Sequence, residues 1–221
     1  MGTVVLVGED AGETIGEYVD HLDGSLVCMS THGRGWPSSV FVGSAAAIVL
    51  ARTDKPIILV GPHCQPDWKL EGNVVAGVDG RPGSALMLPA ARAWASVLGL
   101  GLTVTTVSEP APPSLRPEHA QRLYGSHGDA DTYIQELVAS LEGPDVAVTG
   151  RVIWDPLGPA VGLLSFIVDN GDDASGSTGL LVISSHSQTP APGVPLGRAA
   201  LHIVHQSPVP VLVIPLPAQE A

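Results

Sequence analysis

Two glycines and a hydroxyl residue in the stretch "MSTHGRGWPSSVFVGSAAAIVLAR" have a spacing that suits phosphate binding. Nine residues separate Gly33 from Gly43, and Ser44 follows directly, at the start of an apolar, alanine-rich run. Glycine lets the backbone approach a ligand closely, and the free amides at a helix N-terminus attract anions. The Ser44 hydroxyl could bond a phosphate oxygen or simply cap its own helix. Spacing alone leaves a phosphate cradle and a sharp structural turn both open.

The segments on either side of this loop predict the elements that would position it. Leu26 to Ser30 is predicted to be a buried strand, and Gly43 to Arg52 a helix. Strand and helix patterns alternate to the end of the chain, which predicts an α/β fold with a doubly wound parallel sheet. Ligands of such sheets bind beyond the carboxyl ends of the strands, where Ser30 and His32 would lie.

The composition permits a large core and argues against some partners. Of the 221 residues, 44% are hydrophobic and only 14% are charged. The formal net charge of −12 opposes binding to nucleic acid, and any nucleotide site must supply its own amides, a local cation or a metal ion. No apolar run approaches about 18 residues, so we expect a cytoplasmic protein without a membrane partner. Cys28 lies within an apolar run and is predicted to be a small core residue.

The chain contains an internal repeat. Its second copy runs "GLLVISSHSQTPAPGVPLGRAALHIVHQSPVPVLVIPLP", and the two copies align without a gap from Leu26 and Leu180 onwards. Gly43 aligns with Gly197, and in both copies the order is strand, polar loop, helix, proline and strand. The unit is far longer than a solenoid repeat and therefore indicates duplicated domains.

The first copy resembles the signature end of the universal stress protein family. ATP-binding members carry the pattern G-x2-G-x9-G-[ST], and Gly33, Gly43 and Ser44 match three of its four positions. Ser30 stands at the position of the first glycine. If the resemblance extends to function, this loop would hold the phosphates of ATP.

The second copy resembles the same family over essentially its whole length, with a less complete loop. In "VVAGVDGRPGSALML", Asp79 matches the acidic residue that contacts the nucleoside in ATP-binding relatives. Gly197 is kept, but Ser184 and Ser187 stand at two glycine positions and Arg198 replaces the small hydroxyl residue. Neither copy therefore carries the whole pattern.

The resemblance implies two tandem units of the adenine nucleotide alpha hydrolase-like fold, with strand order 3-2-1-4-5. Residues 1–62 would be a partial domain holding only the last three strands, of which Val4 to Val7 is the first. Residues 63–72 would be a linker and residues 73–217 a complete domain. We expect the final strands of the two units to pair about a pseudo-twofold axis, and a homodimer is possible.

The leading functional hypothesis is a stress-response regulatory protein that binds ATP without rapid turnover, with Mg²⁺ offsetting the phosphate charge. The alternative is a nucleotide-free paired scaffold that recruits partners, and a third is a slow ATPase, for which no general base is evident. His202 and His205 have a spacing compatible with metal but no third ligand, so no metal site is predicted. The candidate nucleotide-binding residues are Ser30, His32, Gly33, Gly43, Ser44, Asp79 and Gly197.

Overall fold

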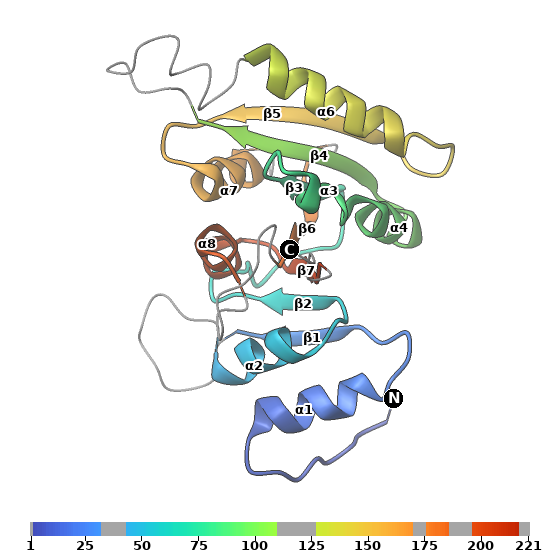
Figure 1. The fold of residues 1–221 in the computed structure, drawn as a ribbon, viewed down its shortest axis with the longest axis vertical. Helices are drawn as coiled ribbons and strands as arrows, with labels where there is room; N and C mark the ends of the chain where they lie inside the picture. Colours follow the sequence, from blue (N-terminus) through green and yellow to red (C-terminus); the bar gives the residue numbers. More distant parts are fainter. Residues whose placement is uncertain (1, 32–42, 110–126, 170–175, 186–195, 217–221) are drawn as a thin grey trace.

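The computed structural model describes residues 2–31, 43–109, 127–169, 176–185 and 196–216, and its strands form one sheet. Figure 1 shows them following one another from β5 at the top to β1 at the bottom, in the order β1-β2-β7-β6-β3-β4-β5. The strands are β1 (Val27–Ser30), β2 (Ile57–Val60), β3 (Asn73–Val78), β4 (Gly101–Ser108), β5 (Val148–Trp154), β6 (Thr178–Ser184) and β7 (Val211–Ile214). The helices are α1 (Ala11–Asp20), α2 (Ser44–Arg52), α3 (Pro82–Ala85), α4 (Leu88–Leu98), α6 (His127–Leu141), α7 (Pro159–Asp169) and α8 (Arg198–Gln206).

The second half of the chain forms a parallel α/β sheet with the predicted strand order. Each neighbouring pair among β5, β4, β3, β6 and β7 is parallel. Numbered within this half, the order is 3-2-1-4-5, so the predicted doubly wound fold is confirmed. The first strand of this half, β3, lies at its centre, because the chain winds outward from it in both directions.

The two halves meet where β2 pairs with β7, in the sheet's antiparallel pair. Ile58 faces Leu212, and these are also equivalent residues of the repeat. The register is therefore symmetric about this residue pair, and the expected pseudo-twofold pairing of the final strands is observed. Leu59 and Val211 face each other across the junction and are both fully buried. This strand edge is occupied within the chain, so the possible homodimer would need another surface.

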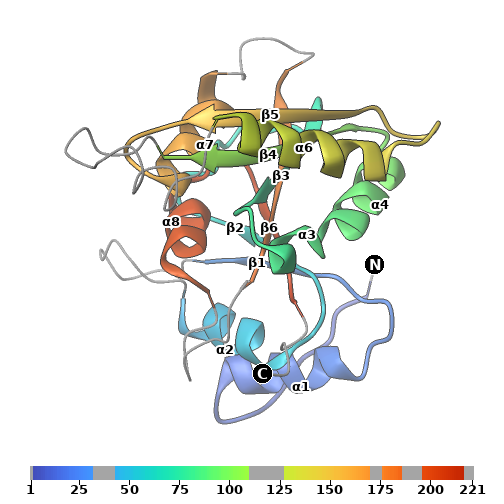
Figure 2. The same ribbon diagram turned by 45° about the horizontal axis from the view of Figure 1, so that its top comes forward.

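Helices cover the two faces of the sheet unequally. Residues of α1, α2, α7 and α8 share one core with the strands, and Figure 2 shows α7 and α8 on one side of the central strands and α4 on the other. The repeat is visible in this layer, since α1 packs on α2 as α7 packs on α8. On the opposite face, α4 packs mainly on β3 and β4, and α6 on β4 and β5. These two helices therefore cover the second half of the sheet.

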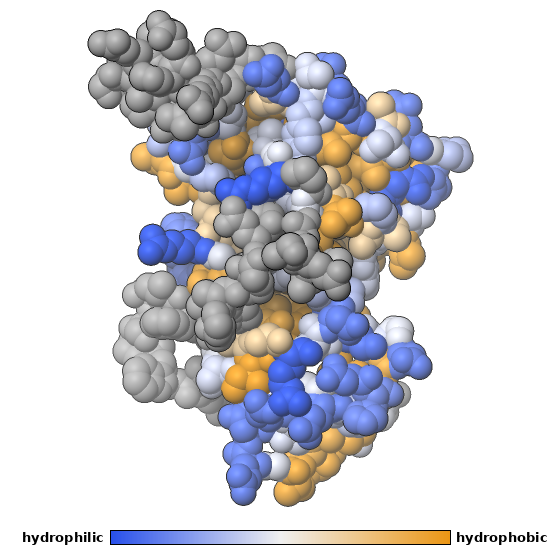
Figure 3. All heavy atoms as spheres, viewed as in Figure 1, coloured by the Kyte–Doolittle hydropathy of each residue, from blue (hydrophilic) through white to orange (hydrophobic). Residues whose placement is uncertain are grey.

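The segment Val4–Val7 was predicted to be a strand, and this prediction is wrong. Residues 2–9 contain no strand, and Val5 and Val7 are 83% and 91% exposed. The corresponding strand of the second half, β5, is held by β4. The described part of the first half has no counterpart of β4, so this segment has no neighbour to pair with. The described residues of the first half thus contribute two strands rather than three, and Figure 3 shows apolar side chains at this end of the molecule.

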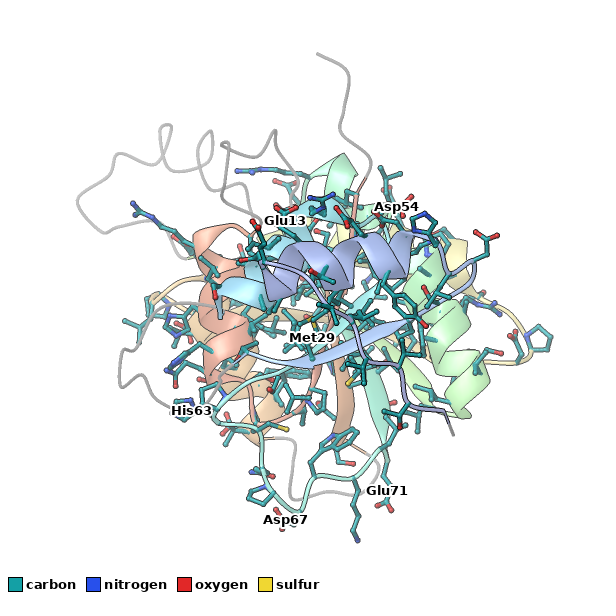
Figure 4. All side chains as sticks on the ribbon, turned by 90° about the horizontal axis from the view of Figure 1, so that it is seen from below. Glu13, Met29, Asp54, His63, Asp67 and Glu71 are labelled. Carbon is teal, nitrogen blue, oxygen red and sulfur yellow. The ribbon has the colours of Figure 1, made fainter. Side chains whose placement is uncertain are left out.

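Cys28 was predicted to lie in the core but is exposed. Its equivalent in the repeat, Val182 of β6, is fully buried between β3 and β7 under the helices of the second half. Leu26 and Leu180 differ in the same way, at 38% and 2% exposure. Cys28 is exposed because β1 lies at the edge of the sheet, away from α4 and α6. On the other face, Met29 lies beneath α1 (Figure 4).

The predicted linker, residues 63–72, packs along the second half. The Gln65 N–H donates to the Pro208 carbonyl at 2.9 Å. The Trp68 indole N–H donates to the Gly179 carbonyl at 2.8 Å. Asp67 and Glu71 point outward in Figure 4. The connection is therefore tied down at two points, and the division into units at residues 1–62, 63–72 and 73–217 stays a prediction.

Over the residues described, no helix has the length and apolar character of a membrane span.

Shortening the Leu59 side chain tests the junction of the two halves. Because Leu59 is fully buried, Leu59→Ala should lower the free energy of unfolding by about 2–5 kcal/mol. Val5→Ala, in the exposed segment, should change it by less than about 0.5 kcal/mol. Urea unfolding monitored by circular dichroism measures both, and an unchanged midpoint for Leu59→Ala would contradict the packing of β2 against β7.

Candidate functional site

The first-copy loop begins at the carboxyl end of β1, but its key glycine serves the packing of the chain. The Gly43 N–H donates to the Thr31 carbonyl at 2.8 Å. A Cβ on Gly43 would lie 2.8 Å from the same oxygen, so only glycine fits there without a shift. Ser44 is exposed and begins α2, and Ser30 ends β1. The Gly43 amide is therefore already engaged and does not point freely to an anion.

Two of the predicted first-copy residues, His32 and Gly33, lie outside the described residues. The described part of the first half also has no counterpart of β3 and β4. In the second half these strands supply Asp79 and a wall of the pocket described next. In the described part of the first copy, the start of α2 therefore lies near the edge strand β1, and no further strand is present to form the other side of a pocket.

A pocket of about 340 Å³ lies at the carboxyl ends of β3, β4 and β6, bordered by α7 and α8. Asp79, just after β3, and Gly197, just before α8, both line it. These two residues come from opposite ends of the second unit, and the fold brings them together. The candidates Ser30, Gly43 and Ser44 belong instead to the first half. The residues lining the pocket are Gly77, Val78, Asp79, Arg81, Ser84, Thr105, Val107, Pro159, Leu163, Ile183, Ser184, Ser185, Gly197, Arg198, Ala199, Ala200 and Ile203.

Asp79 is held by a tight turn at the mouth of this pocket. The Arg81 N–H donates to Asp79 Oδ1 at 3.1 Å, and the Arg81 guanidinium lies 3.9 Å from Oδ2. Ser84 accepts from the Asp79 N–H and donates to the Arg81 carbonyl. Gly80 makes the turn possible with a φ of +77°. Both charged side chains are about half exposed, so their ion pair is weak and the carboxylate stays accessible to a ligand.

The start of α8 forms the second polar wall. Gly197 is its N-cap residue and carries no side chain to cap the helix. Among the described residues, the Gly197 amide makes no bond like that of Gly43, and space is open within 4 Å of its Cβ position. The free amides of the first turn, with the exposed Arg198 beside them, favour an anion. The same repeat position therefore has a different environment in each copy.

The innermost wall contains a polar residue that the sequence did not single out. Thr105 of β4 is fully buried, and within the described part of the chain its Oγ1 has no hydrogen-bond partner. Leu163 and Ile183, which line the same region, are 4% and 5% exposed. Threonine is common in strands, so its type gave no signal. Only the surroundings in the folded chain distinguish it from Thr103, whose hydroxyl lies 3.1 Å from that of Thr149.

Tyr133 of α6 lies behind the Asp79 turn. Burial raises the pKa of its hydroxyl, the Asp79 carboxylate raises that pKa further, and the Ser84 hydroxyl acts in the opposite direction. The neutral phenol is therefore favoured in the folded protein. Because Tyr133 belongs to α6, the charge of Asp79 in the neighbouring turn affects the ionisation of a side chain of this helix.

Comparison with known proteins shows a similarity to one family. A family model described as the universal stress protein family matches residues 2–61. The universal stress protein Rv1996 of Mycobacterium tuberculosis and Mb2019 of Mycobacterium bovis are each 25% identical to this chain over 202 residues. The chain is therefore similar to universal stress proteins, in its first part through the family model and over most of its length through these relatives. The match covers 89% of this chain and 61% of each relative, so the chain spans about three fifths of the length of these relatives.

Solved structures show the same fold. A universal stress protein from Archaeoglobus fulgidus superposes with a TM-score of 0.63 at 16% identity, over 92% of this chain and 66% of that one. A protein of unknown function from Pseudomonas aeruginosa gives 0.60 at 13% identity, over 95% and 69%. The universal stress protein UspA of Lactobacillus plantarum gives 0.53 at 15%, over 65% and 97%. At these identities the likeness concerns the fold alone.

The raised pKa of Tyr133 predicts a loss of stability at alkaline pH. Below about pH 10 the phenol is protonated in both states, so the contribution is fully present. As pH rises, the unfolded tyrosine ionises first, and the free energy of unfolding falls. Tyr133→Phe should reduce this fall, measured by urea unfolding between pH 8 and pH 11. Equal slopes in the two proteins would contradict the shifted pKa.

Proposed function

We propose that this protein is a stress-response regulator that binds an adenine nucleotide, with ATP the first candidate, in the pocket of its second half. The observation that carries the proposal is the meeting of Asp79 and Gly197 on one cavity at the carboxyl ends of β3, β4 and β6. This is where doubly wound sheets bind ligands. The cavity is of the size that small-molecule sites require.

Each part of the pocket matches one part of a nucleotide. The apolar inner wall suits a base, because Leu163 and Ile183 exclude water there. The Asp79 carboxylate accepts hydrogen bonds, which suits sugar hydroxyls. The first-turn amides of α8 and the Arg198 guanidinium suit phosphate oxygens. These groups also offset the net charge of −12, which otherwise repels a polyphosphate.

Mg²⁺ would accompany ATP through the phosphates rather than through a protein cage. In the described part of the chain, no group of three His, Cys, Asp or Glu side chains is placed to hold a metal ion. Asp79 is the carboxylate of the pocket lining, and it already faces Arg81. Mg²⁺ usually keeps several waters and binds substrate phosphates with few protein ligands, so the phosphate oxygens would hold it here.

Binding without rapid turnover is the activity that we favour. Among the described residues, the pocket lining contains no histidine and its carboxylate is paired with an arginine, so these residues offer no evident general base for attack by water. We infer that the protein acts in the cytoplasm by changing its partners with nucleotide occupancy.

The second candidate function is a nucleotide-free paired scaffold. It is favoured by the first copy, where the Gly43 amide is engaged by Thr31. In that view both loops only turn the chain, and the joined halves present a surface to a partner.

Two tryptophan substitutions separate these functions. Ala199 lines the pocket and is exposed, so Ala199→Trp should fill the pocket mouth without disturbing the core. Ser44→Trp is the matched change at the exposed start of α2 in the first copy. Isothermal titration of Mg-ATP should show binding to the wild type, a loss of at least about tenfold for Ala199→Trp, and no change for Ser44→Trp.

If Ser44→Trp loses affinity and Ala199→Trp does not, the nucleotide site is instead the first-copy loop that contains Gly33, Gly43 and Ser44. If the wild type shows no binding heat in the titration and no shift in melting temperature at millimolar Mg-ATP, it does not bind the nucleotide. The scaffold is then the favoured function.

A further inference from the structure

Thr105, in the inner wall of the second-half pocket, carries a buried hydroxyl without a hydrogen-bond partner among the described residues. The residue is fully buried, and the atom in question is its Oγ1. A buried hydroxyl without a partner is costly, and most such groups in proteins are paired. Its presence beside a cavity points to a partner that enters from that cavity.

The neighbouring strands explain why the sheet supplies no partner for this hydroxyl. In the sheet register, Thr105 lies between Gly77 of β3 and Arg151 of β5. Gly77 has no side chain to offer, and it lets Leu163 of α7 come close to the sheet, since a Cβ there would lie 2.9 Å from Leu163 Cδ2. Arg151 is exposed and leaves the hydroxyl unsatisfied.

Thr103 provides an internal comparison on the same strand. Side chains two residues apart on a strand share one face of the sheet, so Thr103 and Thr105 point to the same side. The Thr103 and Thr149 hydroxyls lie 3.1 Å apart, which satisfies both across the strands. Thr103 does not line the pocket, whereas Thr105 does. The unsatisfied hydroxyl thus coincides with the cavity wall.

We propose that Thr105 is a specificity-determining residue of this site and bonds the inner edge of the ligand's base. The inference rests on the nucleotide-binding function proposed above. The phosphate end belongs at the exposed start of α8, near Gly197 and Arg198, so the base is the part that extends to the buried wall. The edge of a purine carries ring nitrogens and exocyclic groups, and a threonine hydroxyl both donates and accepts. A base with a polar inner edge is therefore selected over an apolar ring of the same size.

Replacing Thr105 with its apolar isostere tests this role, because the two expected effects have opposite signs. Thr105→Val removes the unpaired hydroxyl, so the melting temperature of the ligand-free protein should rise by roughly 2–4 °C. The same change removes the bond to the base, so the affinity for Mg-ATP should fall about tenfold. A residue with only a structural role would show the first effect without the second.

Two further variants control for changes in packing. Thr105→Ser keeps the hydroxyl and should retain affinity for Mg-ATP within about threefold. Thr103→Val changes the same face of β4 away from the pocket, so affinity should stay within about twofold and the melting temperature should not rise. Isothermal titration and differential scanning calorimetry on the full chain give both quantities.

The outcomes distinguish the two proposals. If wild type binds Mg-ATP and Thr105→Val binds it equally well, the role of Thr105 is overturned and the nucleotide site stands. If Thr105→Ser loses as much affinity as Thr105→Val, the effect is one of shape, and the hydroxyl has no such role. If wild type binds no nucleotide at all, the proposed function fails, and the inference fails with it.

Discussion

The antiparallel pairing of β2 with β7 is the interaction on which the rest of the structure depends. The first half has only two strands among its described residues, too few for a stable sheet of its own. By joining β7, it extends an existing five-strand sheet and buries its apolar residues in a shared core. Ile57 and Val213, which face each other at this junction, are both fully buried. The second half therefore supplies the sheet edge on which the first half packs.

The sequence was most informative where structure follows from local pattern or from the repeat. Alternating apolar runs predicted the parallel sheet, and the family resemblance of the final strands predicted that they pair. The register centred on Ile58 and Leu212 came only from the structure. Prediction was wrong for Val5 and Cys28, because an apolar segment is buried only if the fold places a neighbour over it. Thr105 could not be found either, since its distinguishing property is the absence of a partner in three dimensions.

The two copies also show why a shared motif residue is weak evidence for a shared function. Gly43 and Gly197 occupy equivalent positions at the start of equivalent helices. The first is required by close contact with the Thr31 carbonyl, while the second borders a cavity and has no described atom within 4 Å of its Cβ position. The motif is closer to the family pattern in the first copy, yet the better-formed pocket lies in the second. Among the described residues, the difference lies in the surrounding strands, because the first half has no counterpart of β3 and β4 there.

The junction at β2 and β7 has a further consequence for how the halves associate. Because both halves belong to one chain, their pairing is intramolecular, and the connection over residues 63–72 sets its effective concentration. That connection is anchored at Gln65 and Trp68, which keeps β2 within reach of β7. Assembly of the paired fold is thus a first-order process that dilution does not reverse. Two separate chains pairing through the same edge would dissociate as their abundance fell, whereas this protein keeps its paired state at any copy number in the cell.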